Sequence, residues 1–342
     1  MHPLQLTIAF ILTSTTAMSL TYLLLAIAPC ALAKCYHGFS SPFSFDASIA
    51  HHPSWMSHLP DSLNLTSLSI PGTHDTMTYS IGSEVLQCQN YNLTVQLNAG
   101  LRYFDIRARL ENNTLQIYHA DGYTGHSYQD VLLSMFSFLD SNPSESIIMR
   151  LKQEGGPIGT NNSITFEESF NDYWHTNPLT SAGATKHFHT FNYSSPLPTI
   201  GSLRSKIFIL QNFPSTIAPN HYGIAWEADQ MALEDDWIVP DVQHLPEKWA
   251  AIKSALEQAS TDVQDNKKLY LAHVSASVGV LPIEAAAGPK NRTATGMNDE
   301  TGRWLEKYDH DAKYGGRTGV VILDFPGQRL IKDILQRNKH FK

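Results

Sequence analysis

Short strand-like runs alternate with helical patterns along the chain from about residue 60 onwards. The runs are rich in β-branched and aromatic residues and cover 67–70, 103–108, 115–119, 147–151, 206–211, 222–226, 268–274 and 319–325. Helical spacing of apolar residues occurs over 128–139, 246–259, 302–308 and 328–337. Strands that alternate with helices form a parallel sheet. We therefore predict an α/β fold, an irregular TIM-type (β/α)₈ barrel that is distorted because some helices are missing, notably between 108 and 115.

The composition excludes several classes of protein. Hydrophobic residues make up 42% of the chain and charged residues 16%, so the chain buries enough apolar surface to fold. Lys and Arg number 24 against 32 Asp and Glu, which gives a formal charge of -8 without a dense basic run. Nucleic acid is therefore not an expected partner. An anionic membrane would repel this net negative charge, so docking to such a membrane would need a local patch on the protein surface.

The first 33 residues form a targeting segment. They contain no charged side chain except the ring of His2, and the apolar run over 20–33 ends in Ala31-Leu32-Ala33, which is typical of a signal-peptidase site. We predict a cleaved signal peptide over 1–33, an N-terminal extension over 34–60 and a single barrel domain over 61–342. The segment is also long enough to span a bilayer, so a retained membrane anchor is the alternative to a fully secreted protein.

Cysteine count and glycosylation motifs favour secretion. Cleavage removes Cys30 and leaves Cys35 and Cys88, which could form one disulfide in an oxidising compartment or stay as two buried thiols. Six N-x-S/T sequons are candidate glycosylation sites, at Asn64, Asn92, Asn112, Asn161, Asn192 and Asn291. The sequence thus predicts a secreted glycoprotein, which we expect to be a monomer.

Charged side chains gather where the predicted strands end, the place where such barrels carry their chemistry. His74 and Asp75 follow the first strand, and alternation puts Asp105 and Arg107, with Arg109 beyond them, on one face of the second. A second histidine, a lysine and a further carboxylate end three later strands, at His119, Lys152 and Asp324. Burying charges at alternate positions costs several kcal/mol unless they are paired or bind a charged ligand.

This set of side chains suits cleavage of a phosphodiester by a neighbouring hydroxyl without a metal. Two imidazoles can share acid and base roles near neutral pH. A guanidinium between them binds a phosphate and holds the charge that develops on its oxygens. A carboxylate beside each ring fixes its tautomer.

The same residues lie in motifs that resemble the secreted, bacterial-type phosphatidylinositol-specific phospholipase C family, in the form seen in fungal homologues. The motifs are SIPGTHDT (69–76), GLRYFDIR (100–107), IYHA (117–120), ESIIMRLKQE (145–154), SAS (275–277) and VVILD (320–324), in family order over about residues 60–335. The resemblance implies a phospholipase C-like phosphodiesterase barrel. It also implies a substrate at a membrane surface, phosphatidylinositol or a related phospholipid, and a protein that acts there peripherally.

Roles for individual residues follow from the resemblance. It implies that His74 is the general base on the inositol 2-hydroxyl, oriented by Asp324, and that His119 is the general acid, supported by Asp75. Arg107 would hold the phosphate, with Asp105 positioning it, and Lys152 would line the inositol pocket. Because the Arg107 cation stands at the phosphate position, no metal and no other cofactor is expected. The expected products are inositol 1,2-cyclic phosphate and diacylglycerol.

The chain departs from the family in the head-group pocket. Asn212 stands where the bacterial enzymes have an arginine. Their inositol-binding Asp is followed two residues later by a Tyr, and its best match here is Asp241, followed by Gln243. Two alternatives therefore stay open: the same chemistry on another head group, such as a glycosylated phosphatidylinositol, or a catalytically silent barrel that binds head groups. Histidines more than about 10 Å apart would favour the silent barrel, because acid and base must reach one phosphate.

Overall fold

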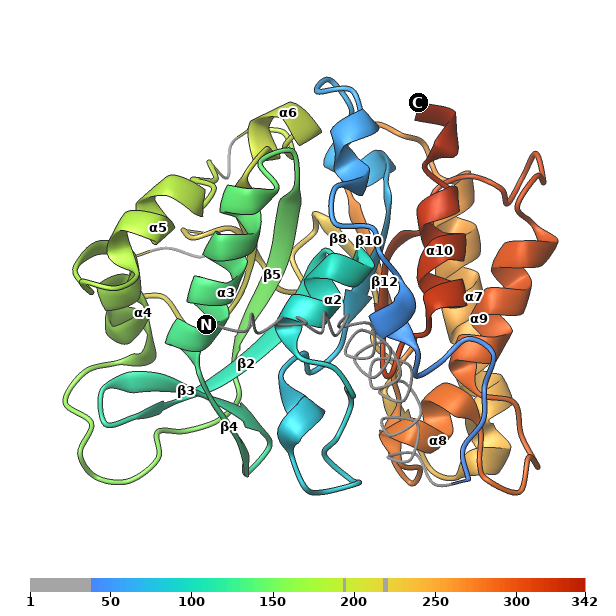
Figure 1. The fold of residues 1–342 in the computed structure, drawn as a ribbon, viewed down its shortest axis with the longest axis horizontal. Coiled ribbons are helices and arrows are strands. Elements are labelled where there is room, and N and C mark those ends of the chain that lie inside the picture. Colours follow the sequence, from blue (N-terminus) through green and yellow to red (C-terminus); the bar gives the residue numbers. More distant parts are fainter. Residues whose placement is uncertain (1–37, 193–194, 218–220, 342) are drawn as a thin grey trace, which may run out of the picture. The chain divides into compact units, whose positions relative to one another are not determined.

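Eight parallel strands form the curled sheet at the centre of the molecule (Figure 1). The computed structural model describes residues 38–192, 195–217 and 221–341. The strands follow one another round the sheet in chain order: β1 (Ser69–Thr73), β2 (Tyr103–Glu111), β5 (Ser146–Gln153), β6 (Lys206–Asn212), β7 (Ile224–Ala225), β8 (Met231–Glu234), β10 (Leu269–His273) and β12 (Gly319–Leu323). The first strand pairs with the last, β1 with β12, in parallel register. The fold is a distorted (β/α)₈ barrel, as predicted.

The barrel is open at one seam. Within the part of the chain that the structure describes, no ladder joins β7 to β8. Neither the β6–β7 connection nor the β7–β8 connection contains a helix among the described residues. The distortion therefore lies here, and the predicted absence of a helix between residues 108 and 115 is also found, because β2 turns there directly into an antiparallel strand.

Helices fill most of the other connections. They are α2 (Leu93–Ala99), α3 (Tyr128–Ser141), α4 (Phe166–His175), α5 (Ser181–His187), α6 (Ile200–Leu203), α7 (Leu245–Thr261), α8 (Pro282–Ala287), α9 (Met297–Lys307) and α10 (Gln328–Gln336). Short 3₁₀ turns lie at Ala47–Ile49, Trp55–His58, Leu65–Ser67, Thr78–Ser80, Val242–His244 and Lys339–Phe341. The four predicted helical patterns correspond to α3, α7, α9 and α10. Capping boxes start α3 at Ser127 and α4 at Thr165, where each hydroxyl accepts the N–H three residues on.

The predicted strand over 115–119 is not a barrel strand. It is β3 (Thr114–His119), which pairs antiparallel with β2 and then with β4 (Gly122–Ser127) in a hairpin beside the barrel. Its alternating apolar residues resemble those of a barrel strand because Leu115 and Ile117 pack against the helices. Strand β2 continues to Glu111, past the end of its neighbour β1, and β3 runs back along it. His119 thus returns to the mouth from the opposite direction.

Alternation along the barrel strands separates two cores. In β12, Val320 and Ile322 belong to the cluster inside the barrel, whereas Val321 and Leu323 pack against the helices. In β2, Tyr103 belongs to the inner cluster, and Phe104 and Ile106 to the outer one. Asp105 therefore shares the inward face with Tyr103, as does Arg107 two residues on.

Most of the segment predicted as an N-terminal extension, residues 34–60, packs with the barrel. Residues from Ser40 onwards belong to the same compact unit as the barrel. The Met56 N–H donates to buried Glu145 (3.0 Å), and the Phe45 N–H donates to the Phe325 carbonyl (3.0 Å). Glu145 also pairs with fully buried Arg102 at 2.8 Å, so this segment closes over an internal ion pair. The predicted signal peptide and Cys35 lie outside the described residues.

The described helices do not include one long and apolar enough to cross a membrane.

Candidate active site

The loop after β1 is clamped so that two catalytic candidates face the barrel axis. The His74 N–H donates to the Leu323 carbonyl of β12 (3.0 Å), and the Thr76 N–H donates to the Asp105 carbonyl of β2 (3.1 Å). The Gln89 amide also donates to the carbonyls of His74 (2.7 Å) and Leu323 (2.9 Å). Between them, Asp75 has a φ of +40°, a backbone strain of the kind found at functional sites.

The His74 ring lies between two carboxylates. Its Nδ1 is 2.9 Å from Asp324 Oδ1, and its Nε2 is 3.0 Å from Asp75 Oδ2. Burial, followed by the charge of Arg107, lowers the pKa of His74 well below its usual value. The ring is therefore neutral near pH 7. With its Nδ1–H donated to Asp324, its Nε2 lone pair is available to accept a proton.

The second histidine reaches the same carboxylate from the β3–β4 hairpin. The Nδ1–H of His119 donates to the Leu86 carbonyl at 2.8 Å, so its Nε2 faces the site, 3.3 Å from Asp75 Oδ2. The His74 and His119 ring centroids are 6.2 Å apart. Both rings are thus within reach of one phosphate, and the separation that would favour a silent barrel is not found.

Arg107 is held by three carboxylates below the two rings. Its Nη2 is 2.8 Å from Asp105 Oδ2, its Nε is 3.1 Å from Asp75 Oδ1, and its Nη1 is 3.5 Å from Glu154 Oε1. Burial opposes the charge of Arg107, but these carboxylates raise its pKa well above the usual value. Asp105 is buried too, yet Arg107 and Arg150 lower its pKa well below the usual value. A fixed cation thus stands among the carboxylates.

A cavity of about 440 Å³ opens above these groups. His74, Arg107 and His119 line one side of it. Its remaining polar lining is Arg150, Lys152, Glu154, Asn212, Glu227, Asp235, Ser275 and Ser277, together with Trp226 and Trp237. A phosphate at the two rings would therefore have its substituents inside a polar, enclosed space.

Comparison with known proteins identifies the family. Residues 68–212 match the family described as phosphatidylinositol-specific phospholipase C, X domain. The chain is 34% identical, over 83% of its length and 84% of the relative's, to a Listeria monocytogenes protein named 1-phosphatidylinositol phosphodiesterase. It is 26% identical, over 88% of its length and 99% of the relative's, to the Staphylococcus aureus protein of that name.

The chain belongs to the phosphatidylinositol-specific phospholipase C family. The solved Listeria monocytogenes phosphatidylinositol-specific phospholipase C superposes with a TM-score of 0.67 at 32% identity, over 85% of this chain and all of that one. A Staphylococcus aureus phosphatidylinositol-specific phospholipase C structure, at 23% identity and a TM-score of 0.67, shows the same fold.

Of the residues predicted for the head-group pocket of this phospholipase C family member, two line the cavity and one does not. Lys152 lines it, with Nζ 2.6 Å from Glu154 Oε2, and so does Asn212. Asp241 does not line it: its side chain is 53% exposed and accepts from the Gln243 N–H and the His244 ring, capping a short turn before α7. The match that placed Asp241 in the pocket was wrong in position.

Asp235 lies where Asp241 was expected. It follows β8 directly, lines the cavity and is followed two residues later by an aromatic side chain, Trp237. Burial raises the pKa of Asp235 to about 6. The sequence analysis missed β8. Had this strand been predicted, the rule that residues after a strand end lie at the barrel mouth would have pointed to Asp235.

Arg150 supplies a guanidinium at the place where the family arginine is absent. Its Nε and Nη2 donate to Asn212 Oδ1 at 3.0 and 2.7 Å, and its Nη1 is 3.6 Å from Asp105 Oδ1. The guanidinium carbon lies 3.7 Å from the centre of the Trp226 ring. Asn212 is therefore an acceptor that orients an arginine from the neighbouring strand. The sequence analysis included Arg150 only within the motif ESIIMRLKQE (145–154) and gave it no role.

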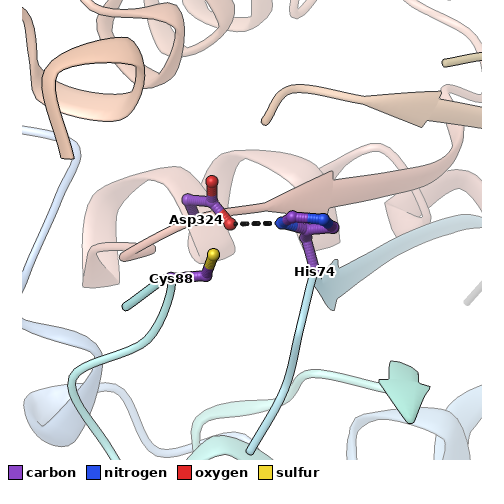
Figure 2. A group of neighbouring side chains, drawn as sticks. All are labelled: His74, Cys88 and Asp324. Carbon is purple, nitrogen blue, oxygen red and sulfur yellow. Dashed lines mark hydrogen bonds and ion pairs between the residues drawn. The ribbon is translucent and has the colours of Figure 1, made fainter. Parts of the chain in front are cut away.

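Cys88 is a free, fully buried thiol beside His74 and Asp324 (Figure 2). Its predicted disulfide partner, Cys35, lies outside the described residues, so that pairing stays a prediction. Of the predicted glycosylation sites, Asn92, Asn112, Asn161, Asn192 and Asn291 are exposed and Asn64 is partly buried.

Proposed function

We propose that this chain is a phosphatidylinositol diacylglycerol-lyase that cleaves its substrate by attack of the inositol 2-hydroxyl on the phosphorus. His74 Nε2 takes the hydroxyl proton, and the new O–P bond closes a five-membered ring. The P–O bond to the glycerol breaks, and His119 Nε2 gives its proton to the leaving oxygen. The products are inositol 1,2-cyclic phosphate and diacylglycerol, and no water or metal enters this step.

One observation carries this proposal. Two imidazoles with centroids 6.2 Å apart share a carboxylate, and a guanidinium held on that carboxylate stands beside them at the cavity floor. Arg107 can hold the phosphate oxygens and stabilise the charge that develops on them, a task that a metal ion performs in metal-dependent phosphodiesterases. The relatives named 1-phosphatidylinositol phosphodiesterase support the choice of substrate.

The test is turnover of phosphatidylinositol vesicles in excess EDTA, with products followed by phosphorus NMR. We expect a cyclic inositol phosphate signal that His74→Ala abolishes. His310→Ala is the matched control, because this ring is 93% exposed. Activity that appears only after Ca²⁺ is added would contradict the role given to Arg107.

A second candidate is the same chemistry on another head group. Arg150, Asn212 and Trp237 make a pocket that differs from the arginine and tyrosine expected from the family. A panel of phosphatidylinositol, glycosylated phosphatidylinositol and non-inositol phospholipids separates the candidates. Turnover of glycosylated phosphatidylinositol alone would favour a modified inositol as the head group.

For the contact with the membrane we propose an apolar edge beside the cavity. Strands β9 (Ile238–Val239) and β11 (Ser277–Val278) form a small two-stranded sheet. Trp237, Ile238 and Val278 expose 47, 61 and 68% of their surface there, and Trp237 also lines the cavity. Val278 has a φ of +82°, which is strained for a β-branched residue. Ile238→Asp should weaken binding to vesicles while leaving hydrolysis of a soluble inositol phosphodiester unchanged; equal losses on both substrates would exclude this edge.

We also propose that the protein is secreted after cleavage near residue 33 and acts as a monomer. The apolar, uncharged first 33 residues and the exposed sequons support this. N-terminal sequencing of protein recovered from the medium, with glycosidase digestion, tests it. A full-length chain retained in the membrane fraction would favour the anchor.

A further inference from the structure

Cys88 is fixed beneath the catalytic base by its backbone. Its N–H donates to Thr78 Oγ1 (3.0 Å), and its carbonyl accepts from the Phe325 N–H (2.9 Å). The residue thus joins the loop after β1 to the segment that carries Asp324. Its side chain is completely buried, with Sγ 3.7 Å from the Leu86 carbonyl and in a side-chain hydrogen bond with Asp324.

The thiol completes a set of metal ligands with two catalytic residues. A ring nitrogen of His74, Cys88 Sγ and a carboxylate oxygen of Asp324 all lie within 4.8 Å of one another (Figure 2). The same sulfur belongs to a second set with Asp75 and His119. A mixed S, N and O set is the ligand chemistry of Zn²⁺ and other thiophilic cations, and not of Ca²⁺ or Mg²⁺.

The nitrogen and the oxygen of the set are close to the spacing that such an ion needs, and the sulfur lies within 4.8 Å of both. With tetrahedral bonds of about 2.0–2.3 Å, neighbouring ligand atoms are about 3.3–3.6 Å apart. His74 Nδ1 and Asp324 Oδ1 are 2.9 Å apart and hydrogen-bonded. They would have to separate by only a few tenths of an ångström. Asp324 is 1% exposed and its Oδ2 has no hydrogen-bond partner among the described residues, so the carboxylate has capacity for a further contact.

We propose that His74 Nδ1, Cys88 Sγ and one carboxylate oxygen of Asp324 bind a thiophilic divalent cation, for which Zn²⁺ is the probe, and that this binding inhibits the enzyme. The thiol gives up its proton to solvent when the S–metal bond forms. The metal also takes the Nδ1 lone pair, so the ring proton moves to Nε2. An Nε2 that carries a proton cannot accept one from the inositol hydroxyl, and the base is blocked.

One kinetic feature follows from the location of the site. His74 lines the cavity, whereas the thiol and Asp324 lie behind it, so the ion must enter past the ring and inhibition should develop slowly.

The test measures metal binding and turnover separately, because the inhibition arm rests on the proposed function and the binding arm does not. Binding is followed by zinc stoichiometry after dialysis and by the ultraviolet charge-transfer band of a cadmium–thiolate bond. Turnover of phosphatidylinositol vesicles is followed with Zn²⁺, Cd²⁺, Ca²⁺ or Mg²⁺ at one concentration. Cys88→Ala and Cys88→Ser are compared with Cys35→Ser, and near-ultraviolet circular dichroism confirms that each variant is folded.

We expect one Zn²⁺ per chain, a cadmium–thiolate band and slow inhibition that EDTA reverses, all retained in Cys35→Ser. Cys88→Ala should lose the band and weaken zinc binding at least about tenfold, since even a partner outside the ligand set changes affinity by that much. His74→Ala, which keeps the thiol, should weaken binding likewise. A band that persists in Cys88→Ala, its absence from the unaltered protein, or binding without inhibition would each overturn the proposal. Absence of turnover without any metal would instead contradict the proposed function and leave the binding result readable.

Discussion

Replacing Asp324 by Asn isolates the electrostatic part of the catalytic pair. The amide has the shape of the carboxylate, and its oxygen can still accept the Nδ1–H of His74 across the 2.9 Å contact. The backbone carbonyl of Asp324, which accepts from Asn298 Nδ2 at 2.9 Å, is unaffected. What changes is the charge that faces the imidazolium when His74 has taken the inositol proton.

The size of the effect follows from the distance between the centres of the two charges, which is somewhat longer than the contact between the two atoms. Two unit charges about 4 Å apart interact by about 4 kcal/mol at an effective dielectric constant of about 20, which is about three factors of ten in rate. Burial and the neighbouring Asp75 raise the pKa of Asp324 well above its usual value, so the carboxylate holds its charge less firmly. We therefore expect kcat to fall by about 10² to 10³, which lies below the loss of about 10⁴ seen when the aspartate of a serine protease triad is replaced.

The assay is kcat on phosphatidylinositol vesicles with thermal unfolding measured in parallel. Asp121→Asn is the control, because this carboxylate lies near the mouth, is fully exposed and pairs only with Arg109. The Asp324→Asn protein should bind vesicles normally and unfold at nearly the same temperature as the unaltered protein. A loss below tenfold in a folded Asp324→Asn protein would refute the argument that this carboxylate stabilises a protonated His74.

Three further predictions concern the pocket, the pH profile and stability. Asp235→Asn should raise KM for phosphatidylinositol at least about tenfold, because it replaces a carboxylate that lines the cavity by an amide, a weaker acceptor for a substrate hydroxyl. Asp241→Asn, outside the cavity, should leave the kinetics unchanged, and the reverse result would restore the original match. Because burial raises the pKa of Asp75 to about 6, this carboxylate is protonated below that pH, and kcat/KM should fall there. If the assignment is right, the pH profile of Asp75→Asn must lack this acidic limb. Arg102→Met should cost about 3–5 kcal/mol in the free energy of unfolding because it leaves a buried carboxylate unpaired, while Arg303→Met, at a 57% exposed site, should cost less than about 1 kcal/mol in the same denaturant titration.

The chemical centre could be predicted because its residues follow simple strand rules. His74 and Asp324 follow neighbouring parallel strands, and such strands end at one edge. Asp105 and Arg107 share the inward face of β2 by alternation. His119 was placed at the mouth for a partly wrong reason, since its strand runs antiparallel and belongs to a hairpin. The length of β2, not the barrel order, brings it there.

Lys152 and Asn212 could be predicted on the head-group side, but Asp235 could not, because its strand carries little signal. Strand β8 is only four residues long and contains Glu234, which is buried through an ion pair of 2.7 Å with Lys248. In the sequence alone a charged residue does not indicate a strand, because the partner that neutralises it, Lys248 on α7, lies 14 positions later. Without β8, Asp235 had no strand end to follow, and the search for an aspartate moved on to Asp241.

The two halves of the site therefore differ in how firmly the barrel holds them. The strands β1, β2 and β12, which position His74, Arg107 and Asp324, pair with one another, and His119 joins them from β3, which pairs with β2. Part of the head-group wall, Trp226, Glu227, Asp235 and Trp237, comes from residues 226–237, which follow the open seam between β7 and β8 and include β8, paired on its other side with β10. These four residues are separate from His74, Arg107, His119 and Asp324, so their side chains can change without removing a group of the chemical centre. Substitutions in residues 226–237 should accordingly alter KM and the choice of head group, whereas substitutions after β1, β2 and β12 should alter kcat.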